Sequence, residues 1–117
     1  MANTDPIIEY ENALALVYDA QALVLKGLRA NPDKQEERRL NKHLAKLRVE
    51  EADLIAMIDA LEDEPVKDLP MPDQALVDEI ARLSGEVEKA TRRNVTAAGA
   101  LKVAGGILDL AINLTGD

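Results

Sequence analysis

The sequence predicts an all-α protein, built as a three-helix antiparallel bundle or as a helical hairpin with a long third helix. Hydrophobic residues make up 47% of the chain, yet Phe and Trp are absent and Tyr occurs only twice. The core must therefore come from Leu, Ile, Val and Ala; Leu and Ala are strong helix formers, whereas sheets are enriched in β-branched and aromatic residues. Apolar residues recur every three or four positions, and prolines divide the chain into three such stretches. At 117 residues we expect one domain, 1–117, with coiled-coil-like packing.

The first stretch predicts a helix over about 6–30. Asp5 can act as its N-cap, and Pro6 suits the first helical position, where the N–H group that proline lacks would be unpaired anyway. Apolar residues then recur at spacings of three, four or seven and predict one buried face. These residues are Ile7, Leu14, Val17, Tyr18, Val24, Leu25 and Leu28.

The second stretch predicts a helix over about 33–62, antiparallel to the first because the connection is short. Either Asn31 is its N-cap before Pro32, or Asp33 forms a capping box with Glu36. Its apolar seam has a strict four-three spacing that only Glu51 interrupts. The seam consists of Leu40, Leu44, Leu47, Leu54, Ile58 and Leu61.

Residues 63–72 contain three of the five prolines and predict a linker. The third stretch predicts one long helix over about 73–115, because an apolar position recurs every three or four residues through five heptads. Asn94 is the one polar member of this seam, and it either fixes the register with a partner or faces solvent. The seam consists of Leu76, Ile80, Leu83, Val87, Ala90, Asn94, Ala97, Leu101, Ala104, Leu108 and Ala111.

The last part of this helix has an apolar arc wider than the stripe of an ordinary surface helix. Between Val95 and Leu114 only Lys102 and Asp109 are charged. Its glycines let another backbone approach closely, or Gly105-Gly106 kinks the helix so that its end folds back over the bundle. We expect this helix to lie between several helices, or to contact another chain or a membrane surface. The predicted interface comprises Asn94, Ala97, Gly99, Leu101, Val103, Ala104, Gly105, Gly106, Ile107, Leu108, Leu110, Ile112 and Leu114.

The net charge of -8 is divided unevenly between two regions. Residues 33–48 carry six Lys or Arg against three acids, whereas residues 50–79 carry eleven acids against one Lys. The overall negative charge and the lack of aromatic side chains for stacking argue against nucleic acid as a partner. The basic patch can instead face the acidic pole of a second copy. The basic patch comprises Lys34, Arg38, Arg39, Lys42, Lys46, Arg92 and Arg93; the acidic pole comprises Asp59, Glu62, Asp63, Glu64, Asp68 and Asp73.

No combination of residues in the sequence predicts catalysis. His43 is the only histidine and the chain has no Cys, so zinc sites and di-iron sites with paired Glu-x-x-His motifs lack their ligands. Ser84, the only serine, has no histidine near it in the sequence to activate it. We therefore expect a protein that is not an enzyme and that uses no metal or cofactor.

The sequence favours a non-enzymatic assembly or adaptor protein that self-associates, or binds another protein, through its C-terminal helix. A component of a phage or of a secretion system is one example of such a protein. Two alternatives stay open: a membrane-surface-active protein that uses the Gly/Ala-rich helix, and an acidic inhibitor or immunity-type protein that binds a basic partner. The lack of a secretory signal pattern and of Cys leads us to expect a cytoplasmic location.

Overall fold

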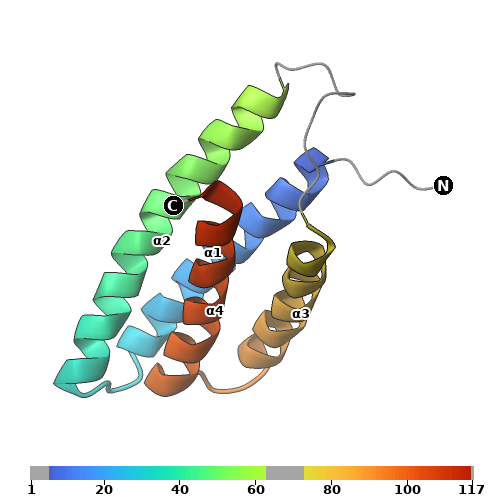
Figure 1. The fold of residues 1–117 in the computed structure, drawn as a ribbon. Helices are drawn as coiled ribbons and strands as arrows, with labels where there is room; N and C mark the ends of the chain where they lie inside the picture. Colours follow the sequence, from blue (N-terminus) through green and yellow to red (C-terminus); the bar gives the residue numbers. More distant parts are fainter. Residues whose placement is uncertain (1–5, 63–72, 117) are drawn as a thin grey trace.

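The computed structural model describes residues 6–62 and 73–116. In these two ranges the chain forms four helices and no strand: α1 (Pro6–Leu28), α2 (Lys34–Glu62), α3 (Gln74–Thr91) and α4 (Ala97–Thr115). Consecutive helices run in opposite directions (Figure 1). The all-α prediction is confirmed, but four helices replace the three that were predicted. The expected N-cap Asp5 and the expected linker 63–72 lie outside the described residues.

Two of the helices form the centre of the bundle. α1 and α4 pack against each other, and α2 and α3 lie on either side, each in contact with both (Figure 1). Side chains from all four helices form one apolar core, to which α3 contributes Ile80, Leu83 and Val87. The largest completely buried side chains are Val17, Leu23 and Val24 of α1, Leu40, Leu47 and Leu54 of α2, and Ile107 of α4.

The turn between α1 and α2 uses two local signals. Asn31 adopts a left-handed conformation (φ 52°), which Asn tolerates better than most residues and which reverses the chain after α1. Asp33 and Glu36 form a capping box: the Glu36 N–H donates to Asp33 Oδ1 at 2.7 Å, and the Asp33 N–H donates to Glu36 Oε1 at 3.1 Å. Of the two N-caps that the sequence allowed, Asp33 is the one used.

The predicted helix 73–115 is divided at residues 92–96, not at Gly105-Gly106. α3 ends at Thr91, and α4 begins after Thr96, whose side chain accepts a hydrogen bond from the Gly99 N–H at 2.9 Å. This cap satisfies one of the N–H groups that a helix start leaves unpaired. Asn94 is exposed in the connecting loop, so it is not a member of an apolar seam.

Replacing Thr96 with Ala is expected to lower the free energy of unfolding by about 0.5–2 kcal/mol, because the first turn of α4 loses its only side-chain cap. Urea denaturation followed by circular dichroism measures the change. Thr91→Ala is the matched control: Thr91 is exposed at the other end of the same loop, and its hydroxyl donates to the Glu88 carbonyl at 2.9 Å. Equal effects of the two substitutions would contradict the capping role.

Two polar contacts tie α2 to the central helices. Glu51 interrupts the apolar seam of α2 as predicted, and its neighbour Glu50, which is only 4% exposed, is a second acid in the buried part of the helix. The Thr115 hydroxyl donates to Glu50 Oε1 at 2.7 Å and so attaches the last turn of α4 to α2. Glu51 is half-buried beside α1, where its Oε1 accepts from Gln21 Nε2 at 2.7 Å. This second contact fixes the relative height of α1 and α2.

Candidate interaction surface

Most of the predicted C-terminal interface lies inside the fold. α4 contacts α1, α2 and α3, and this is the arrangement between several helices that its wide apolar arc allowed. Two of the predicted residues are exceptions. Asn94 is exposed in the loop before α4, and Gly99 is exposed at the start of α4. Of the other predicted residues, Ala97, Ala104, Ile107, Leu108, Leu110 and Leu114 are buried, and Leu101, Val103, Gly105, Gly106 and Ile112 are partly buried.

The glycine pair of α4 lies where neighbouring helices come close. A Cβ on Gly105 would lie 3.5 Å from His43 Nε2 of α2, and a Cβ on Gly106 would lie 3.2 Å from Leu83 Cδ2 of α3. His43 is therefore not a simple surface residue: it is partly buried, and its Nδ1 lies 2.8 Å from the Arg39 carbonyl oxygen. Gly105 and Gly106 serve packing within the chain.

Among the described residues, α4 is also the one helix that is long and apolar enough to cross a membrane. The core helix of a soluble protein meets the same criterion, and Ile107 of α4 is completely buried. The other three helices bury Ile107, Leu108, Leu110 and Leu114, so lipid contact through these side chains would require the bundle to open.

On the outer face of α1 the other three described helices leave a set of apolar side chains exposed, with Glu11 among them. The apolar residues of this outer face are Ile8, Ala15, Tyr18, Ala22 and Leu25, all of which are exposed. The exposed fraction of the side chain is 50% for Ile8, 46% for Tyr18 and 43% for Leu25. The residues recur at spacings of seven, three, four and three, so they form one stripe along the helix and not scattered positions.

Tyr18 and Leu25 were predicted to lie on the buried face of α1, and this prediction is wrong. The predicted Val17 and Val24 are buried, and the predicted Ile7, Leu14 and Leu28 are partly buried against the core. The rest of the buried face consists of residues that were not predicted, among them Ala13, Leu16, Ala20 and Leu23. Apolar residues surround most of α1, so spacing alone did not decide which arc the other three helices cover. The seven-residue repeat on the outer face was the available signal.

Polar groups border the outer face of α1. Asp19 is exposed at its edge, and partial burial raises the pKa of its carboxyl above the usual value. Tyr10, on the opposite side of α1, is buried, and burial raises the pKa of its phenol.

On α2, Ile55 is 37% exposed. It lies one helical turn beyond Glu51, which places it at about the height of Tyr18 along the bundle.

The two charged regions lie at opposite ends of the bundle. The basic residues of α2 and the loop with Arg92 and Arg93 are at the same end, although α4 separates them (Figure 1). All seven predicted basic residues are exposed. The described members of the acidic pole, Asp59, Glu62 and Asp73, are exposed at the other end; Asp63, Glu64 and Asp68 lie outside the described residues. The bundle is therefore basic at one end and acidic at the other.

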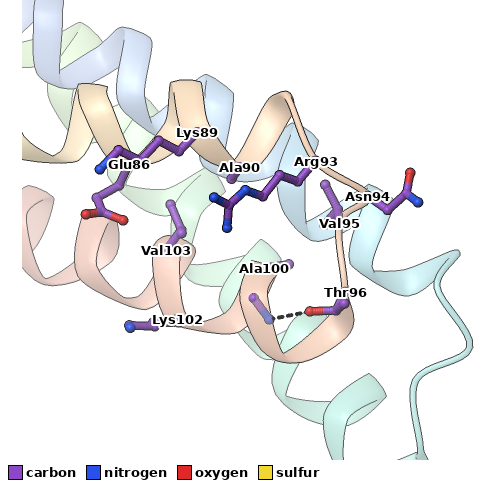
Figure 2. A pocket seen from close by; sticks show the side chains of 11 residues that line it. Glu86, Lys89, Ala90, Arg93, Asn94, Val95, Thr96, Ala100, Lys102 and Val103 are labelled. Atoms are coloured by element: carbon purple, nitrogen blue, oxygen red, sulfur yellow. Dashed lines mark hydrogen bonds between the residues drawn. The ribbon is translucent and has the colours of Figure 1, made fainter.

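An open pocket of about 300 Å³ lies between α3, α4 and their connecting loop. Figure 2 shows the Arg93 side chain directed toward α4 and the capping bond of Thr96 at the edge of the pocket. Lys89 and Lys102 also line it and are exposed, together with the partly buried Glu86. The pocket offers positive charge, but none of its charged side chains is buried so as to define a ligand, and we assign it none.

The described part of the chain contains no arrangement that suggests catalysis. No group of three or more His, Cys, Asp or Glu in residues 6–62 and 73–116 is placed to hold a metal ion. Ser84 is exposed on α3, whereas His43 lies against α4. Comparisons of the chain with protein-family models, with curated proteins and with solved structures find no match.

Proposed function

We propose that this protein is a non-enzymatic assembly protein whose copies associate through the outer face of α1. The observation that carries the proposal is the exposed stripe of Ile8, Ala15, Tyr18, Ala22 and Leu25, which Glu11 interrupts between Ile8 and Ala15. Single exposed apolar residues are normal on protein surfaces, whereas apolar residues that recur along one exposed helix face make that face a candidate interaction site. Tyr18 adds the kind of side chain that is enriched in interfaces.

The proposed contact lies on the N-terminal helix α1, whereas the sequence predicted a contact through the C-terminal helix. α4 buries its apolar arc within its own bundle, whereas α1 still has an apolar face after it has packed against three helices. The seven-residue repeat on this face is typical of coiled-coil pairing between helices. A membrane-active role through α4 has less support, because Ile107, Leu108, Leu110 and Leu114 are buried within the bundle.

The experiment is sedimentation velocity over roughly 1 to 300 µM, a range that covers weak as well as moderate association. The unmodified protein is expected to form dimers or larger species as its concentration rises. Tyr18→Lys is expected to weaken this association at least about tenfold, because a charge replaces a large aromatic contact.

Val49→Lys is the matched control, since Val49 is 56% exposed on α2 and is not part of the outer face of α1. Its association is expected to equal that of the unmodified protein. A chain that remains monomeric at the highest concentration would refute the proposed function. Equal loss of association in both variants would show that the contact lies elsewhere.

A further inference from the structure

We propose that the outer face of α1 pairs with the same face of a second copy. The two helices run antiparallel, and the two-fold axis that relates them crosses the outer face at the level between residues 16 and 17. This inference rests on the proposed function and adds to it the occupant and the register. Three observations carry it: the size of the residues in the repeat, the charges that border the face, and the opposite charges of the two ends of the bundle.

The apolar residues form two adjacent rows on α1. Ile8, Ala15 and Ala22 occupy one row, and Tyr18 and Leu25 occupy the other. In an antiparallel pair of helices a residue of one row lies opposite a residue of the other row. With the axis between Leu16 and Val17, Ala15 lies opposite the partner's Tyr18, and Ile8 lies opposite the partner's Leu25. The central layers thus combine a small with a large side chain, which allows the two helices to approach and pack closely.

The charged neighbours favour the antiparallel arrangement. Glu11 occupies the same row as Tyr18, so a parallel pair in register would place it directly against the partner's Glu11 within the seam. Two facing carboxylates at such a position are destabilising. In the antiparallel arrangement Glu11 lies opposite the partner's Ala22, with the partner's Lys26 one helical turn to one side of that position and the partner's Asp19 one turn to the other. Asp19 then lies at the level of the partner's Leu14, so no carboxylate directly faces a carboxylate of the partner.

The ends of the bundle provide an independent argument from charge. The acidic pole lies at the end where α1 begins, and the basic patch lies at the end where α1 terminates (Figure 1). An antiparallel pair therefore brings the basic end of each copy beside the acidic end of the other, whereas a parallel pair brings like ends together. Complementary potentials of this kind select one orientation over the other.

The expected association is weak. The stripe from Ile8 to Leu25 is about 25 Å long at 1.5 Å per residue. One helix pair of this length buries less surface than a standard stable interface. We therefore expect a dissociation constant in the micromolar range and a dimer that dissociates on dilution.

The register can be tested by disulfide formation, because the natural chain contains no Cys. Ile8→Cys and Leu25→Cys are made as separate variants, one with an affinity tag so that the two chains differ in mass. Each variant alone and an equal mixture of both are incubated in a glutathione redox buffer, in which disulfides exchange until the favoured pairing predominates. Species are identified by mass spectrometry without reduction. Val49→Cys mixed with Leu25→Cys controls for random collision.

The proposal predicts that the mixture of Ile8→Cys and Leu25→Cys yields mainly the mixed disulfide dimer, at least about fivefold above the collision control. Homodimers of either variant alone should not exceed that control, because a disulfide requires Cα atoms within about 7 Å. Homodimers of each variant alone would indicate a parallel pair and would overturn this inference while the proposed function stands. A dimer in sedimentation without any cross-link above the control would overturn it as well. A monomer in sedimentation would refute the proposed function itself.

Discussion

Replacing Ile107 with Ala is expected to lower the free energy of unfolding by about 2–5 kcal/mol. Ile107 has no exposed surface, and it lies on the central helix that contacts the other three. The substitution removes most of the Ile side chain and its apolar contacts with the surrounding core. It leaves a cavity that the rigid helices fill only in part. Chemical denaturation at low micromolar concentration, where the chain is expected to be monomeric, measures the effect.

Ile55→Ala removes the same atoms from a residue that is 37% exposed on α2 and serves as the matched control. Its expected effect is about 1 kcal/mol or less, because little apolar surface returns to water. Comparing the two variants shows whether α4 is a core helix of this bundle or an interface for another molecule. If α4 were held free for another molecule, Ile107→Ala would resemble Ile55→Ala and would mainly weaken association.

The structural features predicted correctly from the sequence depend on local signals. The capping box of Asp33 and Glu36 lies within four residues, and it fixed the start of α2 to within one residue. The seam of α2 was predicted because Leu40, Leu44, Leu47, Leu54 and Ile58 recur at helical spacing, and all five are buried. Each signal reports the conformation of its own segment and needs no information about distant residues.

The division between α3 and α4 was not predicted, because the break preserves the spacing of the apolar residues. Residues 92–96 contain neither Gly nor Pro, and the steps from Ala90 to Asn94 and from Asn94 to Ala97 are four and three residues. The apolar repeat thus continues across a loop. The remaining signal was Thr96, a good N-cap residue three positions before Gly99. Periodicity indicated a single helix, and the cap determined the actual helix start.

The candidate interaction surface was not predicted because it depends on where the other helices lie. α1 is apolar around most of its circumference, so its spacing is compatible with several buried arcs. The contacts with α2, α3 and α4 together cover the arc that contains Val17 and Val24 and leave Tyr18 and Leu25 outside. For α4 the sequence indicated a partner, because its apolar arc is wide. The helices that pack against this arc belong to the same chain.

α1 approaches α4 closely at Gly27, and this position is expected to be sensitive to substitution. A Cβ on Gly27 would lie 2.8 Å from the Cβ of Ala100 and 3.3 Å from Leu40 Cδ2. The Ala100 methyl group is attached directly to the backbone of α4 and has no rotamer that moves it away. Gly27→Ala must therefore push the two central helices apart, and we expect a loss of about 1–3 kcal/mol in the free energy of unfolding.

Gly85→Ala tests whether this loss comes from the contact. Gly85 lies within α3, and a Cβ there would meet nothing within 4 Å. The higher helix propensity of Ala should raise the free energy of unfolding by up to about 1 kcal/mol at this position. The same substitution is thus expected to have opposite signs at the two sites, and a gain in stability at Gly27 would contradict the close packing of α1 on α4.

A double-mutant cycle isolates the contact itself. Ala100→Gly removes the methyl group that a Cβ at position 27 would meet, at the expense of helix propensity in α4. With both substitutions the one remaining methyl group takes the place of the other across the helix pair. We therefore expect the double variant to be more stable than the sum of the single effects predicts, by at least about 1 kcal/mol. Additive effects would mean that α1 and α4 do not meet at these two residues.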